Sequence, residues 1–141
     1  MSFSFLITAR LKSKRLKKKL LLPIKNIPII VHMINRIKFS NEINRIILCT
    51  STNVQDDPLE VISEKENIKC FRGSENDVLQ RLLDAANKYE IDSFANMTAD
   101  SPLIDPQLID KTVKYYKSKR NIDLLLPMEG SLCGCKIVNV S

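Results

Sequence analysis

The 141-residue sequence lacks the features that mark membrane and secreted proteins. No run approaches the roughly 18 consecutive apolar residues of a membrane span. The opening Met1-Ser-Phe-Ser places no basic residues before the first apolar stretch, which disfavours a secretory signal. The hydrophobic content of 44% is ordinary for a soluble protein. We therefore expect a cytoplasmic protein without membrane contact, formed by one domain.

Side chains suited to covalent or zinc chemistry are also scarce. The single histidine, His32, lies in a predicted helix without an acidic partner nearby in the sequence, which favours packing over acid–base catalysis. Cys49 and Cys70 lie in predicted strands, where a free cysteine is usually a small buried residue. Cys133-x-Cys135 lacks the spacer and the second pair of a zinc knuckle. We expect neither a covalent nucleophile nor a zinc site.

Acidic residues are missing from the first part of the chain. Residues 1–41 contain ten Lys and Arg and no Asp or Glu, whereas the remaining hundred contain twelve and sixteen. This asymmetry indicates an anionic partner, which could be a nucleotide, a nucleic acid or an anionic surface. A nucleic acid is the least favoured of these, because Phe3 and Phe5 are the aromatic residues near the cations and stacking platforms are therefore few.

The cations follow the first predicted strand. Phe3 to Ala9 is apolar and β-prone, as expected for a buried strand. A loop after such a strand can hold phosphates at the carboxyl end of a sheet. The alternative is a solvated arm that binds polyanions without selectivity. The cations of this segment are Arg10, Lys12, Lys14, Arg15, Lys17, Lys18 and Lys19.

Strand and helix patterns alternate along the chain. This order predicts an α/β fold with a doubly wound, mostly parallel sheet and helices on both faces. The predicted strands are 3–9, 45–50, 68–72, 92–98, 122–126 and 135–140. The predicted helices are 28–38, with Pro28 in its first turn, then 56–67, 75–89 and 106–119.

Polar residues follow two of these strands. Asp100, ahead of a proline-held turn, is placed to bind a hard cation, although a turn-capping role is the alternative. Ser74 precedes a helix in which Asp77 fits the third position of a capping box. A helix N-terminus can also contact a ligand, so both roles stay open for these two residues. Asp105 fits the N-cap of the last helix.

Three motifs together resemble one family. The segment Ile7-Thr-Ala-Arg10-x-x-Ser13-x-Arg15-Leu16-x-x-Lys19, the segment Arg72-Gly-Ser74-x-x-Asp77-Val-Leu-x-Arg81, and Asp100-Ser-Pro102-Leu-Ile-Asp105-Pro106 are similar to motifs of the cytidylyltransferases that activate acidic sugars. The resemblance covers the acylneuraminate and 3-deoxy-manno-octulosonate enzymes and is nearest to the spore-coat polysaccharide group. Lys17 and Lys18 stand where that family has Pro and Gly, and Ala99 replaces another Gly.

The resemblance implies a Rossmann-like fold of the nucleotide-diphospho-sugar transferase type and transfer of CMP from CTP to an acidic sugar in polysaccharide biosynthesis. It implies that Arg10 and Lys19 hold the triphosphate as catalytic residues, and that Asp100 binds Mg²⁺. The nucleotide-binding residues that it implies are Ala9, Arg10, Ser13, Arg15, Lys19, Ser74, Asp77 and Arg81.

Members of that family are longer than 141 residues. We therefore expect residues 1–141 to form the nucleotide-binding domain without the acceptor-binding and dimerisation part, which leaves a homodimer and turnover by this chain open. The alternative is a non-catalytic module that binds a nucleotide or a polyanion.

Overall fold

The computed structural model describes residues 3–119, 121–128 and 134–141. Its strands are β1 (Phe3–Thr8), β2 (Pro23–Ile24), β3 (Ile27–Pro28), β4 (Ile43–Ser51), β5 (Lys69–Gly73), β6 (Ser93–Thr98), β7 (Leu124–Leu125) and β8 (Lys136–Asn139). Its α-helices are α1 (Ile29–Ile37), α2 (Asp57–Lys65), α3 (Val78–Lys88) and α4 (Pro106–Ser118), and two 3₁₀ turns are η1 (Lys19–Leu21) and η2 (Val54–Asp56).

The main sheet has the strand order β5-β4-β1-β6-β8-β7. β1 pairs in parallel with β4 and β6, and β4 pairs in parallel with β5. β8 is antiparallel to both β6 and β7. The prediction of a mostly parallel sheet is confirmed, with β8 running antiparallel to both of its neighbours near one edge.

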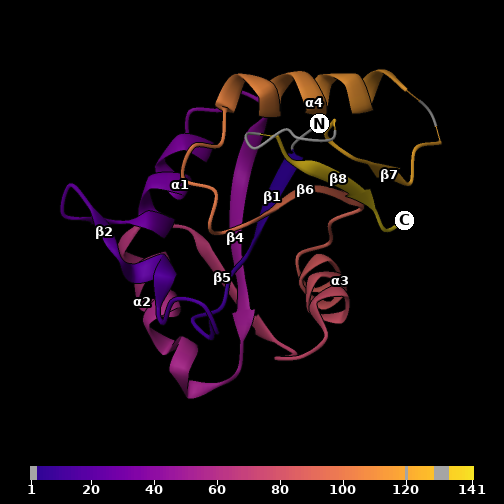
Figure 1. The fold of residues 1–141 in the computed structure, drawn as a ribbon. Coiled ribbons are helices and arrows are strands. Elements are labelled where there is room, and N and C mark those ends of the chain that lie inside the picture. Colours follow the sequence, from indigo (N-terminus) through magenta and orange to yellow (C-terminus); the bar gives the residue numbers. More distant parts are fainter. Residues whose placement is uncertain (1–2, 120, 129–133) are drawn as a thin grey trace.

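Alternate side chains of β1 enter two separate cores, because successive residues of a strand face opposite sides of the sheet. Phe3, Phe5 and Ile7 pack with apolar residues of α1, α2 and α4. Leu6 packs with Leu82 and other residues of α3 on the opposite face. Figure 1 shows α1 and α2 on one side of the sheet and α3 on the other. Helices on both faces are confirmed.

Two element boundaries differ from the predictions near the first helix. The segment before α1 forms a small hairpin of β2 and β3, in which Lys25 and Asn26 have φ angles of 49° and 65°. Two successive positive φ values are typical of a tight hairpin turn. Pro28 ends β3, and α1 begins one residue later, so the prediction that Pro28 lies in the first helical turn is wrong. His32 Nε2 lies 2.8 Å from the carbonyl oxygen of Ile24 and ties the hairpin to α1.

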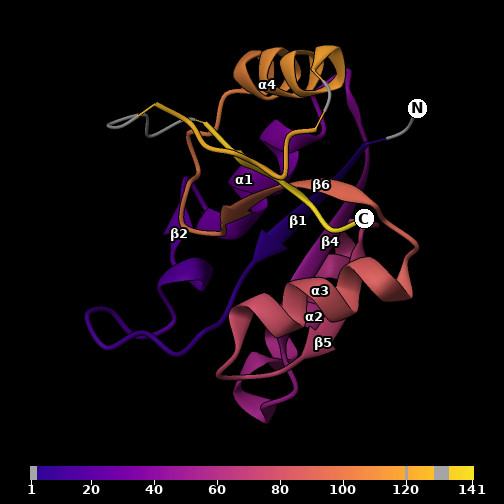
Figure 2. The same ribbon diagram turned by 90° about the vertical axis from the view of Figure 1, so that its right-hand side faces the viewer.

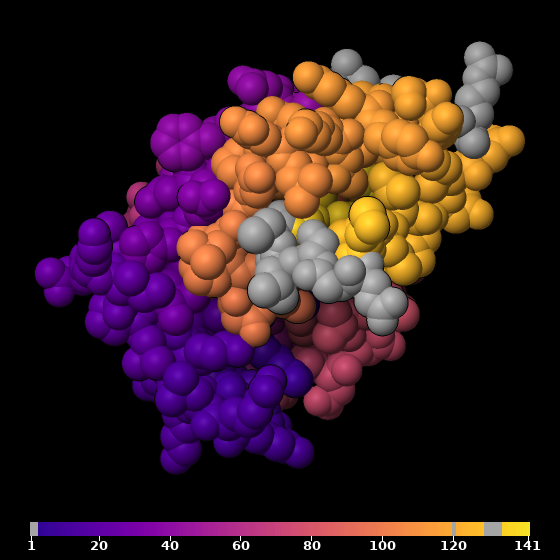
Figure 3. Space-filling view, turned by 45° about the horizontal axis from the view of Figure 1, so that its top comes forward, coloured from indigo at the N-terminus to yellow at the C-terminus, as the bar shows by residue number. Residues whose placement is uncertain are grey.

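The last two strands, β8 and β7, lie at one edge of the sheet. Figure 3 shows the orange and yellow C-terminal third at one end of the visible face and the indigo N-terminal segment at the other. The predicted strand 122–126 shortens to the two residues of β7. Cys133 lies outside the described residues. Within the described ranges, each helix is too short or too polar to cross a bilayer.

Candidate functional site

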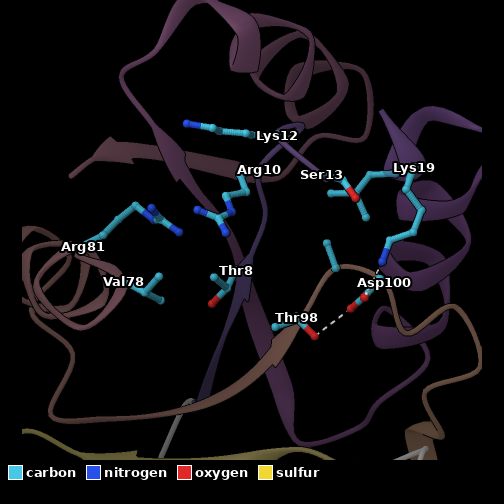
Figure 4. A pocket seen from close by; sticks show the side chains of 11 residues that line it. Thr8, Arg10, Lys12, Ser13, Lys19, Val78, Arg81, Thr98 and Asp100 are labelled. Carbon is cyan, nitrogen blue, oxygen red and sulfur yellow. Dashed lines mark hydrogen bonds and ion pairs between the residues drawn. The ribbon is translucent and has the colours of Figure 1, made fainter. Parts of the chain in front are cut away.

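A cavity opens at the carboxyl ends of β1 and β6, where Thr8 and Thr98 are paired across the two strands. Its volume is about 330 Å³. From β1 the strand order runs outward to β4 and β5, and the chain then returns to place β6 on the other side of β1. In doubly wound sheets such a reversal is the usual ligand site. The cavity is lined by Thr8, Arg10, Lys12, Ser13, Lys19, Leu20, Val78, Arg81, Thr98, Ala99 and Asp100 (Figure 4).

Lys19 and Asp100 form an ion pair at one side of the cavity. Lys19 Nζ lies 2.8 Å from Asp100 Oδ2, although the two residues are 81 positions apart in the chain. The Thr98 hydroxyl donates to Asp100 Oδ1 over 2.8 Å. The hydrogen bond from Lys19 lowers the pKa of Asp100, and that from Thr98 lowers it further. Asp100 is therefore an ionised carboxylate at neutral pH.

Arg81 forms the opposite wall and is fully buried. Its Nη1 donates to the carbonyl oxygen of Ser74 over 2.6 Å, whereas Nε and Nη2 have no hydrogen-bond partner within the described part of the chain. Burial lowers the pKa of Arg81, and the charge of Arg10 lowers it further. Arg10 and Arg81 point toward one another from the two sides of the cavity (Figure 4). Two facing guanidinium groups, one with unpaired donors, are suited to an anionic ligand.

A glycine allows Arg81 to pack in this position. A Cβ atom at Gly73 would lie 2.7 Å from Cε1 of Phe71 and 3.2 Å from Cγ of Arg81. The first distance is too short for a real contact, so a side chain at residue 73 would displace the Phe71 ring or the stem of Arg81. The close packing of Phe71 and Arg81 therefore explains why a glycine stands at residue 73 in the Arg-Gly-Ser segment.

Ser74 and Asp77 cap the start of α3. The Ser74 hydroxyl accepts from the backbone N–H of Asp77 over 3.1 Å, and Asp77 Oδ1 accepts from the N–H of Gln80 over 2.9 Å. Asp77 is thus the N-cap of α3, and the predicted helix start at residue 75 and third helical position for Asp77 are wrong. Neither residue lines the cavity. Their contact with a nucleotide stays a prediction.

The cationic loop divides into residues that line the cavity and residues that do not. Arg10, Lys12, Ser13 and Lys19 line it, whereas Arg15 is exposed and lies outside the lining. Figure 2 shows the loop after β1 projecting away from the sheet. The backbone of Ala9 donates to the carbonyl of Cys49 over 3.1 Å and continues the β1–β4 ladder. Of the five nucleotide-binding residues predicted in this segment, the cavity contains Arg10, Ser13 and Lys19, whereas Ala9 and Arg15 lie outside its lining.

Three polar cavity residues, Thr8, Lys12 and Thr98, were not among the site residues predicted from the sequence. Lys12 follows Arg10 by two positions, a spacing that places both on one side of an extended chain, so its role could have been inferred. Thr98 ends β6 directly opposite Thr8, and its position depends on the β1–β6 register, which sequence patterns alone do not provide.

Asp100 fits Mg²⁺ as one ligand among several. Mg²⁺ in nucleotide sites usually has one or two carboxylate ligands, with phosphate and water oxygens filling the other positions. Asp100 provides one ionised carboxylate beside cations that suit phosphate. Among the described residues no three His, Cys, Asp or Glu side chains cluster into a metal cage. The site suits a metal that arrives with a phosphorylated ligand.

The described cysteines do not suggest thiolate chemistry. Burial raises the pKa of Cys49 to about 12 and that of Cys135 to about 12. The pKa of Cys70 is also raised, chiefly by burial. Their thiols stay protonated at neutral pH, and protonated thiols are poor nucleophiles and poor metal ligands.

A family model described as cytidylyltransferase matches residues 4–128. The spore coat polysaccharide biosynthesis protein SpsF of Bacillus subtilis is 29% identical over 97% of this chain, and the 3-deoxy-manno-octulosonate cytidylyltransferase of Chlorobaculum parvum is 31% identical over 80% of it. The structure of a cytidylyltransferase from Leptospira borgpetersenii superposes with a TM-score of 0.92, at 34% identity over 99% of the chain. The chain spans 59% and 45% of the two curated relatives and 60% of the Leptospira chain.

Proposed function

The chain belongs to the cytidylyltransferase family, and on this basis we propose that its cavity binds CTP with Mg²⁺ and transfers CMP to a hydroxyl of an acidic sugar. One observation carries the proposal: a cavity lined by Arg10, Lys12, Lys19 and Arg81 lies where the strand order reverses. The names of relatives that act in spore-coat polysaccharide synthesis and on 3-deoxy-manno-octulosonate support a sugar acceptor.

In the proposed reaction an acceptor hydroxyl attacks the α-phosphorus of CTP. A new O–P bond forms while the bond to the β-phosphate oxygen breaks, so the products are the CMP-sugar and pyrophosphate, and the hydroxyl proton passes to solvent. Such transfer depends on positioning and charge neutralisation more than on a covalent nucleophile. Arg10 and Lys12 from the loop and Arg81 from α3 would supply positive charge around the triphosphate.

Bound Mg²⁺ would neutralise phosphate oxygens as a Lewis acid. Asp100 would hold it, and Lys19, now paired with Asp100, would then be free to contact a phosphate. In this proposal Ala9 and Ser13 face the phosphates, Arg15 reaches them from outside the cavity, and Ser74 and Asp77 border the base. The start of α3 is capped by the Asp77 carboxylate, which would repel a phosphate and so suits an uncharged base better.

Calorimetric titration with CTP and a random DNA duplex tests nucleotide binding in about 0.15 M salt, where exposed charges are partly screened. We expect CTP to bind more tightly, and Arg10→Gln to weaken CTP binding by about tenfold through loss of a charge-assisted contact. Lys114→Gln, at an exposed position on α4, is the matched control and should bind as the wild type. Equal affinity for DNA and CTP would overturn the nucleotide site.

Pyrophosphate release from CTP, assayed with Mg²⁺ and a panel of acidic and neutral sugars, tests transfer. We propose that residues 1–141 supply the nucleotide-binding half and position the acceptor poorly, since misplacement by about 1 Å can cost 100-fold in rate. Turnover near about 10 s⁻¹ would contradict this part of the proposal. CTP binding without release from any sugar would favour a non-catalytic nucleotide-binding module.

A further inference from the structure

We propose that Asp56 is a positioning residue that fixes the base of the cationic loop and thereby sets Arg10 and Lys12 against the cavity. The inference rests on the proposed function in one respect, namely that these two cations contact phosphate. Asp56 ends η2, which follows β4, and the sequence pattern assigned it only to the start of the helix α2.

The contacts of Asp56 join three segments. Its Oδ1 accepts the backbone N–H of Leu11 over 2.8 Å, across 45 positions of the chain. Its Oδ2 accepts the hydroxyl of Ser51 at the end of β4. The carboxylate is fully buried, as is Ser51, and Leu11 is buried beside it. One side chain thus ties the start of the loop to the carboxyl end of β4.

Helix capping does not account for these contacts. Asp56 occupies the N-cap position of α2, yet its side chain accepts no hydrogen bond from the helix. A buried carboxylate is costly unless its oxygens are satisfied, and here both oxygens are satisfied by the loop and by the strand. The side chain therefore serves the loop rather than the helix.

The anchored residue lies between two cavity-lining cations. Arg10 and Lys12 flank Leu11, and both side chains are exposed toward the cavity. The backbone hydrogen bonds recorded for residues 10–18, within the described part of the chain, otherwise stay local: the N–H of Leu16 bonds to Ser13, and the carbonyl of Lys18 accepts from Leu21. Fixing the backbone at Leu11 therefore sets the backbone position from which the Arg10 and Lys12 side chains extend.

The charge of Asp56 has a second effect. Burial lowers the pKa of Arg81, and the negative charge of Asp56 opposes that shift. The same carboxylate therefore favours the charged form of the buried arginine in the opposite wall while it holds the loop.

Two substitutions separate the hydrogen bonds from the charge. Asp56→Ala removes both contacts, whereas Asp56→Asn keeps an acceptor for Leu11 and can donate to Ser51. We expect Asp56→Ala to weaken binding of CTP and of inorganic pyrophosphate by about tenfold, the effect of losing a hydrogen bond to a charged group. Asp56→Asn should recover most of that loss. Asp110→Ala, which removes a carboxylate anchor at the opposite end of the sheet, is the control for a loss of stability away from the cavity and should bind both anions within twofold of the wild type.

Hydrogen exchange of the Leu11 amide in the ligand-free protein gives a readout that a general loss of stability would not reproduce. Asp56→Ala should accelerate this exchange while the amides of β1 stay protected, and Asp56→Asn should restore protection. If Asp56→Ala does not fold, Ser51→Ala carries the test, because loss of the hydroxyl frees the carboxylate; faster Leu11 exchange and weaker pyrophosphate binding are then expected.

The outcomes distinguish the two proposals. Unchanged Leu11 exchange and unchanged pyrophosphate affinity in the folded variants would overturn the role of Asp56. So would an equal loss of pyrophosphate affinity in Asp110→Ala. A wild-type protein that binds pyrophosphate but binds DNA as tightly as CTP would overturn the proposed function. The effect of Asp56 on pyrophosphate binding would still stand.

Discussion

Two loops at opposite ends of the sheet are each held by an aspartate, but to very different extents. At the amino ends of the strands, Asp110 of α4 accepts hydrogen bonds from the Ser40 hydroxyl, from the backbone and side chain of Asn41, and from the N–H of Glu42. At the carboxyl ends, Asp56 holds the backbone of the cationic loop at Leu11. The α1–β4 loop is thus fixed along its length.

The difference separates a structural loop from a binding loop. Residues 40, 41 and 42 are each hydrogen-bonded to Asp110, so this loop adds to stability but cannot rearrange around a ligand. Residues 12–18 lie between an anchor at Leu11 and the Lys19–Asp100 pair, and most of their side chains are exposed. Few fixed contacts are typical of segments that move when a ligand binds.

The largest effect is expected for Asp110→Ala. Loss of several hydrogen bonds to one carboxylate should lower the free energy of unfolding by about 2–3 kcal/mol. For a chain of this size that corresponds to roughly 10 °C in the thermal midpoint, measured by calorimetry. CTP affinity at 15 °C should be unchanged. A large loss of affinity would mean that the two ends of the sheet are coupled and the comparison fails.

Asp100→Asn should act in the opposite way, on binding and not on stability. The Lys19–Asp100 pair is partly exposed, with 32% and 42% of the two side chains accessible, so its loss should cost less than about 1 kcal/mol in stability. The Mg²⁺-dependent gain in CTP affinity should fall by about tenfold, or about 1.4 kcal/mol, because the carboxylate ligand is lost. Titrations with and without Mg²⁺ measure it, with Asp123→Asn as an exposed control.

Should Asp100→Asn instead lower the thermal midpoint by more than about 5 °C with the metal response intact, Asp100 would be a structural cap.

Lys18→Gly should stabilise the loop slightly. Lys18 has φ 50° and ψ 35°, a left-handed conformation that costs a non-glycine residue about 1–2 kcal/mol. Glycine loses more chain entropy on folding, by roughly 0.5–1 kcal/mol, so a net gain of about 0.5 kcal/mol is expected by denaturant unfolding. Lys17→Gly is the matched control, since Lys17 has no positive φ, and it should be destabilising. Equal effects of the two substitutions would show that backbone strain at Lys18 is negligible.

A further small effect concerns the pH dependence of stability. Burial alone would raise the pKa of Asp110, but the hydrogen bonds from Ser40, Asn41 and Glu42 together lower it below its ordinary value of 3.8. A lowered pKa in the folded state adds stability that is complete above pH 3.8 and is lost as the pH falls from there through the folded pKa. The stability difference between wild type and Asp110→Asn should therefore shrink by less than about 1 kcal/mol between pH 6 and pH 3, since the group is partly exposed. If the stability difference between the two proteins grew on acidification, the pKa of Asp110 would not be lowered in the folded state.

The sequence predicted the fold where its patterns were local. Apolar strands such as Phe3 to Ala9 and helices with an apolar stripe recur along the chain, and their alternation leaves few arrangements other than a parallel sheet. The β2–β3 hairpin was missed because its turn is Lys25-Asn26, whereas Asn-Gly is the usual signal for two positive φ values. The start of α3 was misplaced because Ser74 and Asp77 can each cap a helix, and propensity does not rank them.

The site was likewise predicted where its residues belong to a local sequence pattern. Arg10, Ser13 and Lys19 belong to a local motif, and the cavity contains all three together with Arg81 and Asp100. The roles of Thr98 and Asp56 depend on register and on contacts across tens of residues. No local pattern encodes those distances, so the structure was needed to find them.

The register of the central strand has a consequence for how the chain assembles during synthesis. β1 lies in the middle of the parallel sheet, and one of its two neighbours is β6, which comes much later in the chain. Ser4 of β1 pairs with Phe94 of β6. At about 5–20 residues per second, a ribosome needs roughly 5–18 s to make the intervening stretch. During that interval the β6-facing edge of β1, a strand with apolar residues at four of its six positions, has no partner. Parallel pairing between distant segments also folds slowly. The high positive charge that follows β1, besides any role in binding, would keep nascent chains apart through mutual repulsion until the sheet closes.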